Sequence, residues 1–420
     1  MTQVTGQRAM QRTKSVILLF NFMLVVSVFL SGMAANSQQA TGWKAYKLDV
    51  ENVRACVFTP DGHSVAFVYL TDHLLSEKPW HVTYTSHLAL WNLETGNVEE
   101  KSKWEYTSTE QGDPWPSQPR YAAYTANGNY LVVFDPATLR VLDARTYAEV
   151  KRVNYEEPKE TFANDGWAIA DFSLAADGSR VAIGISSTIG ANGGFVRVYD
   201  LGTGQVVREW RLHDGVRYVT GAALSQDGDR VAASSLPVAR SSDPETFIPV
   251  GVDNVRVMDV QTGKTITEVN TKYVAGPVLF GPNNTLLTGS INDDRKGYSL
   301  DTIKVWDSRT GKLLREITNP RTGVHYRLDL SPDGKLILGY SGTEKPVENF
   351  VTVDTQQFQI WDFASGQALA TSPEFGPNKD EIPRMQLSAD GKFVVVWWGN
   401  GFAKPFVYGV PAMASSRPKQ

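Results

Sequence analysis

The sequence is poor in cysteine, in basic charge and in recognisable catalytic motifs. Its single cysteine, Cys56, excludes a disulfide within the chain and a redox cysteine pair, so packing must supply the stability. The 41 Lys and Arg residues do not exceed the 45 Asp and Glu residues. That balance argues against a nucleic-acid partner, because phosphate binding needs a basic surface. The Cys-x-x-Cys-His motif of covalent haem attachment is absent.

Motifs for nucleophilic or metal-assisted chemistry are absent too. Gly-x-Ser-x-Gly does not occur, and spacing alone singles out no Ser, His and Asp as a catalytic set. The glycine-rich segment 190–194 has neither phosphate-loop nor dinucleotide spacing. The histidines form no His-x-x-x-His or Cys/His pattern. We therefore predict no metal and no cofactor, name no catalytic residue, and leave open whether the protein is an enzyme.

A long apolar run is found at the N-terminus. Three basic residues precede the run 16–30, and small residues from Ser31 to Ala35 follow it. This order predicts a signal peptide over residues 1–35, cleaved near Ala34 or Ala35, and export to the periplasm or the cell exterior without a stable membrane span. The alternative is an uncleaved N-terminal anchor. Cleavage lowers the basic count from 41 to 38 against 45 acidic residues, a formal net charge of −7.

A four-residue turn motif recurs seven times in the rest of the chain. It contains an Asp-Gly or Asn-Gly pair, or once Asn-Asn, which tolerates the positive φ of tight hairpin turns. The motifs occupy residues 59–62, 125–128, 175–178, 225–228, 281–284, 331–334 and 388–391. A large apolar residue stands three positions before and four positions after the Asp or Asn of every motif. Each motif is therefore expected to join two strands that pack into an interior.

A second motif follows in six of the seven repeats. It consists of a short apolar strand, an Asp or Asn, and a turn that usually ends in Thr-Gly or Ser-Gly, as in Val305 to Gly311. The Asp or Asn is expected to bond the local backbone before a fourth strand begins. Four strands in roughly 50 residues correspond to one propeller blade. The predicted fold is thus all-β, a seven-bladed β-propeller over residues 43–410 with a polar C-terminal tail, 411–420.

The last repeat lacks its fourth strand. The segment from Trp43 to Val50 supplies a spare strand before the first repeat. We expect this strand to pair with the last blade and close the ring, which protects sheet edges that would otherwise invite aggregation.

Two of the third strands end in Trp-Asp, at 306–307 and 361–362, and each leads into a Thr-Gly or Ser-Gly turn. With the upstream Asp-Gly hairpins, these features resemble the WD-repeat propeller family over about residues 43–410. The closer resemblance is to divergent, secreted bacterial propellers of the WD-repeat-like or quinoprotein-like superfamily. The family's Gly-His pair is absent, so its complete Asp–His–Ser/Thr–Trp network is not expected. The resemblance implies a fold that hosts scaffolds, hydrolases and redox enzymes alike.

The second-to-third-strand connections vary most in length. In propellers that resemble this one, they share the top face with the starts of the first strands. They are expected to be long loops, where binding normally resides. They span residues 71–86, 185–194, 235–253, 290–301 and 341–356.

Candidate binding residues lie on this face. Four arginines begin first strands and can bind a carboxylate, a phosphate or an acidic peptide segment. They are Arg54, Arg120, Arg327 and Arg384. The alternative is that these arginines pair with Asp171, Asp329 and neighbouring backbone. Trp80 is a candidate aromatic anchor, together with Tyr84 and Trp115, unless these rings only cover the first blade.

Three functions follow. The first is a monomeric, exported interaction module that binds a protein or a small anionic ligand through a loop-rich top face; the missing catalytic set favours it. The second is a propeller enzyme at the channel mouth, either a hydrolase or lactonase, or a redox protein with a non-covalent cofactor. The third is a structural component of an envelope complex.

Overall fold

The computed structural model describes a single compact unit within residues 40–420. The described residues are 42–77, 80–108, 121–135, 138–154, 167–187, 194–212, 217–240, 247–249, 254–271, 275–291, 300–318, 327–347, 350–375, 383–398 and 403–411. The predicted signal peptide, residues 1–35, and residues 412–420 of the predicted tail lie outside the described residues.

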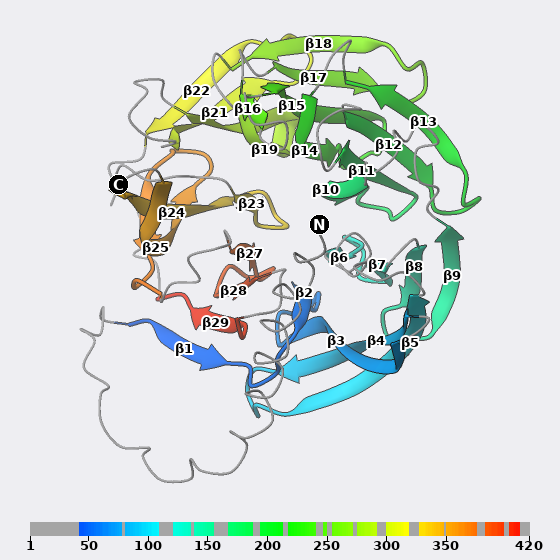
Figure 1. The fold of residues 1–420 in the computed structure, drawn as a ribbon. Helices are drawn as coiled ribbons and strands as arrows, with labels where there is room; N and C mark the ends of the chain where they lie inside the picture. The colour runs from blue at the N-terminus through cyan, green and yellow to red at the C-terminus, as the bar shows by residue number, and fades with distance from the viewer. Residues whose placement is uncertain are drawn as a thin grey trace, which may run out of the picture. The chain divides into compact units, whose positions relative to one another are not determined.

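Seven antiparallel sheets form the blades of a ring, which confirms the predicted seven-bladed propeller (Figure 1). In each blade the first strand lies nearest the centre and the last strand lies at the outside (Figure 1). Blade 1 contains β2 (Val53–Phe58), β3 (Ser64–Glu77), β4 (Trp80–Asn92) and β5 (Val98–Ser108). Blade 2 contains β6 (Tyr121–Tyr124), β7 (Tyr130–Asp135), β8 (Thr138–Asp143) and β9 (Glu149–Asn154). Blade 3 contains β10 (Trp167–Leu174), β11 (Arg180–Ser187), β12 (Gly194–Asp200) and β13 (Val206–Arg211).

The remaining four blades follow the same order. Blade 4 contains β14 (Arg217–Leu224), β15 (Arg230–Arg240), β17 (Asn254–Asp259) and β18 (Thr265–Asn270), with β16 (Phe247–Pro249) paired to β15. Blade 5 contains β19 (Ala275–Phe280), β20 (Thr285–Ile291), β21 (Leu300–Asp307) and β22 (Leu313–Thr318). Blade 6 contains β23 (Leu328–Leu330), β24 (Leu336–Val347), β25 (Phe350–Asp362) and β26 (Ala368–Thr371). Blade 7 contains β27 (Arg384–Leu387), β28 (Phe393–Trp397), β29 (Phe406–Gly409) and β1 (Lys44–Lys47).

The predicted closure of the ring is confirmed. β1 pairs antiparallel with β29, in a register that runs from Lys44 opposite Gly409 to Lys47 opposite Phe406. The strand is shorter than the segment 43–50 expected from the sequence, but Leu48 after it is buried in the core between blades 1 and 7. The first and last parts of the propeller therefore share one sheet.

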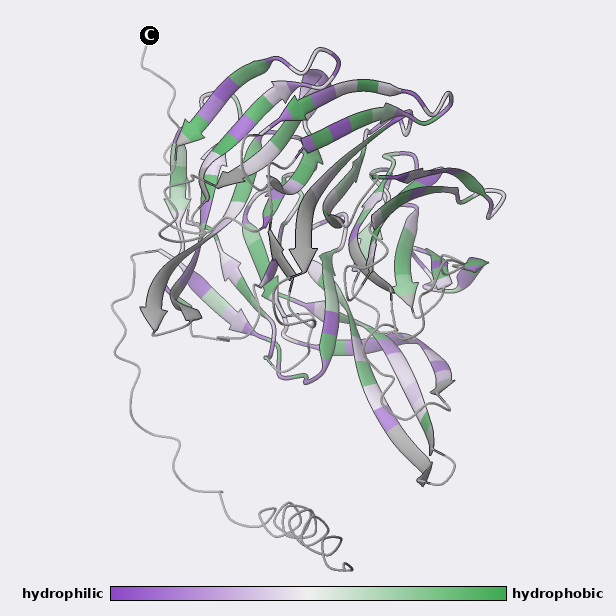
Figure 2. Cartoon of the chain, turned by 45° about the horizontal axis from the view of Figure 1, so that its top comes forward, coloured by the Kyte–Doolittle hydropathy of each residue, from purple (hydrophilic) through white to green (hydrophobic). Residues whose placement is uncertain are grey.

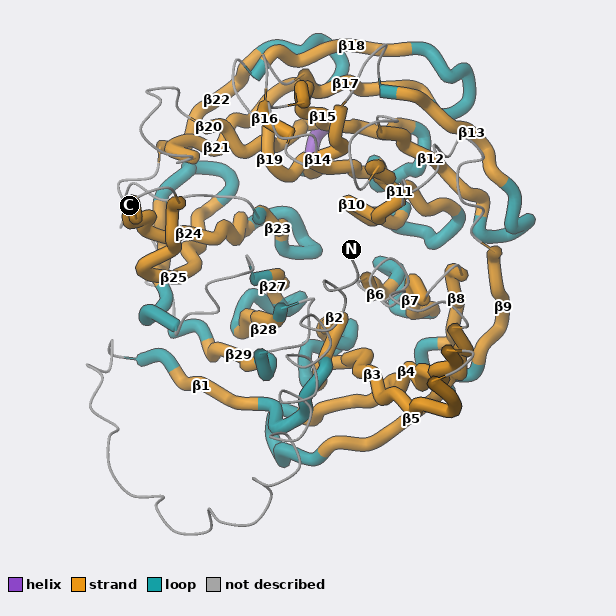
Figure 3. Tube along the Cα trace, viewed as in Figure 1, coloured by secondary structure: helices purple, strands orange, loops and turns teal. Residues whose placement is uncertain are grey.

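The first turn of a blade is built from a hydroxyl and an Asp or Asn side chain. The Thr59 hydroxyl donates to the Asp61 carboxylate at 2.6 Å and accepts the Ser64 amide at 3.1 Å. Gly62 completes this turn with a φ of +73°. Four other blades repeat this hydroxyl-to-side-chain bond, three with an acid and one with an amide: Thr125 and Asn127, Ser225 and Asp227, Ser331 and Asp333, and Ser388 and Asp390. In blade 5 the turn is instead the 3₁₀ helix η1 (Pro282–Asn284), the one helical element among the described residues (Figure 3).

The second turn confirms the predicted role of its acid. Asp307 accepts the amide of Thr310 at 2.8 Å and its hydroxyl at 2.9 Å. These bonds hold the pKa of Asp307 below its ordinary range. The equivalent residues make the same bonds, namely Asn92, Asp143, Asp200, Asp259 and Asp362. One link of the typical WD-repeat network is also present, since the Trp306 indole donates to the Thr288 hydroxyl at 3.0 Å.

The core consists of apolar layers between neighbouring blades. One core cluster contains Val181 of blade 3 and Val132 of blade 2, and another contains Phe67 of blade 1 and Val395 of blade 7. Apolar and polar residues alternate along the outer strands, as Figure 2 shows, because the outermost strand of a blade is buried on fewer sides. The innermost strand of blade 1 is buried along its whole length.

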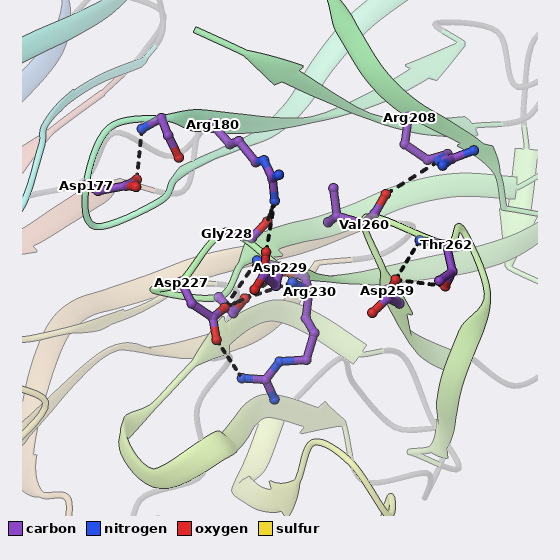
Figure 4. A network of polar contacts seen from close by, with 12 residues as sticks. Asp177, Arg180, Arg208, Asp227, Gly228, Asp229, Arg230, Asp259, Val260 and Thr262 are labelled. Atoms are coloured by element: carbon purple, nitrogen blue, oxygen red, sulfur yellow. Dashed lines mark hydrogen bonds and ion pairs between the residues drawn. The ribbon is translucent and has the colours of Figure 1, made fainter. Parts of the chain in front are cut away.

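Polar contacts join neighbouring blades at the second turns. Three fourth strands carry a Lys or Arg eight positions after the acid of the second turn in their own blade. Each of these side chains donates to a backbone carbonyl in the second turn of the next blade, two positions after the acid of that turn. Lys151 bonds Gly202, Arg208 bonds Gln261 at 2.6 Å, and Arg315 bonds Ala364. In the same region Arg180 bonds the Gly228 carbonyl at 2.8 Å (Figure 4). We call the three fourth-strand contacts the carbonyl clamps.

Candidate functional site

The expected top-face loops of blades 1 and 6 are instead mostly paired strands. β2 begins at Val53, opposite Tyr69, but β3 and β4 stay paired beyond that point, as far as Glu77 opposite Trp80. In blade 6, β24 and β25 likewise stay paired to Val347 opposite Phe350, far beyond the start of β23.

The prediction of loops was wrong here because these segments are rich in Thr, Val and aromatic residues, which favour a continued ladder. We call residues 71–86 the blade 1 arm and residues 341–356 the blade 6 arm. The connection 235–253 is partly ordered in the same way by the pairing of β15 with β16. Most residues of the connections 185–194 and 290–301 lie outside the described residues.

Arg384 of blade 7 contacts a residue of blade 2. It begins β27 in blade 7, and its guanidinium Nη2 donates to the hydroxyl of Tyr121 in blade 2 at 3.1 Å. Its guanidinium carbon also lies 4.3 Å from the centre of the Tyr121 ring, a cation–π contact. Blade 1 stands between blades 7 and 2, so this contact spans one blade.

Asp171 of β10 joins the same group. Its carboxylate accepts the amides of Phe172 at 2.9 Å and Ala222 at 3.0 Å. Burial raises the pKa of Asp171, while these amides and the positive charges of Arg327 and Arg384 act to lower it. The charges of Arg327 and Arg384 therefore favour the ionised form of Asp171.

Aromatic rings complete this group. Tyr121 stacks on Phe172, with ring centroids 5.8 Å apart. We call Tyr121, Asp171, Phe172, Arg327 and Arg384 the inner-strand cluster. Its members come from blades 2, 3, 6 and 7, and the sequence pointed only to its charged residues, since no repeat position marks Tyr121 or Phe172.

Side chains of the innermost strands also link blade to blade. Asp329 of β23 accepts the amide of Leu387 of β27 at 3.0 Å. Burial raises the pKa of Asp329 to about 6, although its bonds to the Leu387 and Leu330 amides act to lower it. Gln386 accepts the Phe58 amide of blade 1 at 2.9 Å in the same manner. Asp329 is thus a structural link between blades 6 and 7.

The other predicted site residues are placed as follows. Arg54 lies on β2 and is 7% exposed. Trp80 begins β4, but its side chain lies outside the described part of the structure, as do Arg120 and Trp115. Tyr84 lies on the blade 1 arm, half-buried, between Asp72 of β3 and Tyr106 of β5.

The described residues hold neither a metal-binding cluster nor a membrane-spanning helix. Within the described ranges, no three His, Cys, Asp or Glu side chains are grouped so that they can hold a metal ion. In that same part of the chain, no helix is long and apolar enough to cross a membrane.

Comparison with known proteins establishes the fold alone. No protein-family model matches the sequence, and no curated protein matches it. Among solved structures, a chain in the crystal structure of the mitotic checkpoint complex is similar, with a TM-score of 0.55 at 14% identity over 93% of this chain and 100% of that one. The β-propeller domain of Cps50 (Swd1) from Myceliophteria thermophila has a TM-score of 0.53 at 11% identity, over 87% of this chain and 100% of that domain. These neighbours are WD40 propellers.

Proposed function

We propose that this protein is an exported interaction module that binds an acidic segment of a partner protein on the top face of blades 6, 7 and 1. This proposal rests on one observation: both arms and the described candidate arginines belong to these three consecutive blades. Arg327 immediately precedes the inner strand of blade 6, Arg384 begins that of blade 7, and Arg54 lies on that of blade 1.

The two arms stand on either side of blade 7. Each is an antiparallel ladder with one register shift, so less ordering entropy is lost on binding than with an unpaired loop. Antiparallel pairing places each arm at the end of its blade where the inner strand starts. A partner held between the arms would therefore face the arginines.

The chemistry of the partner follows from charge. Guanidinium groups bind carboxylates through short, charge-assisted hydrogen bonds. Tyr121 and Phe172 add aromatic surface beside Arg384, and such residues are enriched where binding energy concentrates. Both solved neighbours are propellers, and the first belongs to a protein complex. This supports protein as the partner class.

Export is part of the proposal and is supported by the order of basic, apolar and small residues at the N-terminus. The intact mass of the chain purified from its native envelope fraction is expected to lack the first 34 or 35 residues. A full-length chain in the cytoplasm would contradict export without touching the binding proposal.

The binding proposal is tested by site-specific photocrosslinking in the native host. A crosslinker at Tyr84, on the blade 1 arm, is expected to capture one discrete protein. A matched crosslinker at Leu314, which is 52% exposed at the start of an outer strand, is expected to capture none. Arg327→Gln and Arg384→Gln are each expected to weaken binding of the captured protein about tenfold, whereas Arg309→Gln at a turn leaves it unchanged. Equal capture from both positions would overturn the top-face assignment.

A further inference from the structure

Blade 1 carries a hydrogen-bonded line of three side chains that the interaction function does not use. The hydroxyl oxygen of Thr71 lies 2.9 Å from Nε2 of His87, and Nδ1 of the same imidazole lies 2.8 Å from the Glu100 carboxylate. A hydroxyl, an imidazole and a carboxylate joined in this order are the parts of a base-activated nucleophile. Sequence spacing does not reveal them, because they lie 16 and 13 residues apart.

The register of the sheet brings the three together. Thr71 lies on β3, His87 on β4 and Glu100 on β5. His87 is directly opposite Tyr69, two residues before Thr71, and Glu100 is opposite Ala89, two residues after His87. Because residues two apart on a strand face the same side, all three side chains stand on one face of the blade.

The hydrogen bonds fix the proton positions on a neutral imidazole. An ionised carboxylate can only accept, so Nδ1 of His87 carries the proton and donates it to Glu100. Nε2 then presents its lone pair, and the Thr71 hydroxyl donates to it. The hydroxyl is thus held in the arrangement from which its proton can be removed.

Tyr69 holds the imidazole in place. Its ring stacks on that of His87, with centroids 4.6 Å apart and planes inclined by 12°. Its hydroxyl donates to the same Glu100 oxygen at 3.3 Å. Burial, the Glu100 charge and this bond together raise the pKa of Tyr69, so the phenol keeps its proton. Tyr69 therefore contacts both the base and the carboxylate.

The nucleophile is accessible. Thr71 is exposed at the base of the blade 1 arm, whereas the His87 side chain is only 16% exposed and that of Glu100 is 46% exposed. A substrate can reach the hydroxyl while most of the imidazole is shielded from water.

We propose that Thr71 is a nucleophile that accepts an acyl group from an ester. The Thr71 oxygen bonds to the ester carbonyl carbon as His87 takes the hydroxyl proton. The bond from that carbon to the leaving oxygen then breaks, and His87 returns the proton to the leaving alcohol. In the second half, His87 takes a proton from water, the resulting hydroxide attacks the acyl carbon, and the Thr71 oxygen leaves with the proton as the acid is released. Glu100 and Tyr69 are positioning residues.

The experiment uses the mature protein and p-nitrophenyl acetate as the probe. Wild-type protein is expected to release about one nitrophenolate per chain in a fast phase, and peptide mass spectrometry is expected to find the acetyl group on Thr71. Thr85 is the internal control, because it pairs directly with Thr71 across the strands. Acetylation of Thr71 no higher than that of Thr85 in wild-type protein overturns the proposal, and this comparison needs no variant.

Variants assign the roles. Thr71→Ser is expected to keep the fast phase with the label still at position 71, whereas Thr71→Val and His87→Gln lower the rate at least tenfold. Glu100→Gln is expected to move the pH profile of labelling, which a merely structural residue would not do. Thermal melts establish that each variant is folded. An unchanged labelling rate in folded His87→Gln would show that the three side chains only tie the strands together.

Discussion

The indole of Trp43 lies edge-on to the ring of Phe358, with centroids 5.5 Å apart and planes inclined by 78°. Trp43 precedes β1, the closing strand of blade 7, whereas Phe358 lies on β25 of blade 6. Tyr408 of β29 contacts the same indole at 6.0 Å. The segment that closes the ring therefore also anchors the last two blades to each other.

Removal of this anchor is expected to destabilise the whole ring. Trp43→Ala is expected to cost about 2–3 kcal/mol, below the range for a fully buried Trp because Trp43 is only half-buried. Deletion of residues 43–50 removes all of β1 and exposes the edge of β29, so a larger fall in melting temperature and some aggregation are expected. Thermal unfolding followed by circular dichroism measures both. Lys44→Ala, at an exposed position of the same strand, is the control, and a melt of the deletion variant equal to wild type would contradict closure by β1.

The carbonyl clamps give a second prediction. The Arg315 guanidinium bonds the carbonyls of Phe363 and Ala364 in the next blade and also lies over the Phe363 ring at 5.5 Å. Arg315→Met keeps most of the apolar stem but loses these bonds, so a loss of about 1–2 kcal/mol is expected. Urea unfolding measures it. The exposed Arg309→Met is the control, and an equal effect of the two changes would assign the loss to net charge.

Blade 4 lacks a cation at the clamp position, so a carbonyl clamp can be introduced there. Thr267 occupies the position of Arg208 and Arg315, eight residues after the turn acid, and its hydroxyl lies beside Gly311 of blade 5. Arg208 lies beside Gly263 in the same way. Thr267→Arg is therefore expected to reach the Arg309 carbonyl and raise stability by up to about 1 kcal/mol. Thr265→Arg on the same strand is the control. A drop in the melting temperature of Thr267→Arg would show that an arginine at this position of blade 4 does not form a carbonyl clamp.

The repeat made the fold predictable, because each blade is encoded locally. A pair such as Asp61-Gly62 specifies its own hairpin through side-chain bonds within five residues. Closure was predictable by counting strands. The last repeat ends after its third strand, β29, and the segment that begins at Trp43 supplies one strand that belongs to no other blade. Both inferences need only the order of strands along the chain.

The site was harder to predict, because it depends on register and on contacts between distant blades. Arg384 and Tyr121 are 263 residues apart, and no spacing rule connects them. The alignment of Thr71, His87 and Glu100 depends on a bulge between Leu88 and Ala89, which shifts Glu100 onto the face of His87. A one-residue slip would place these side chains on opposite faces.

Asp329 provides a prediction about pH. Burial raises its pKa to about 6 in the folded protein, above the ordinary value of 3.8. The folded protein therefore binds a proton between these values that the unfolded chain has lost. The stabilisation from this group is complete below the unfolded value and disappears as the pH rises through about 6. Between about pH 5 and about pH 7.5, this single group is expected to remove about 1 kcal/mol of stability.

Asp329→Asn isolates this contribution, because it removes the titration and keeps an oxygen that accepts the Leu387 amide. The free energy of unfolding is measured in urea for both proteins at the two pH values, and all other titrating groups cancel in the difference. Wild type is expected to lose stability relative to Asp329→Asn as the pH rises, even if the substitution is destabilising at both values. A difference that stays constant would mean that Asp329 is already ionised at the lower pH, with a pKa held near its ordinary value by the Leu387 and Leu330 amides. A difference that grows in the opposite direction would place a cation against the carboxylate.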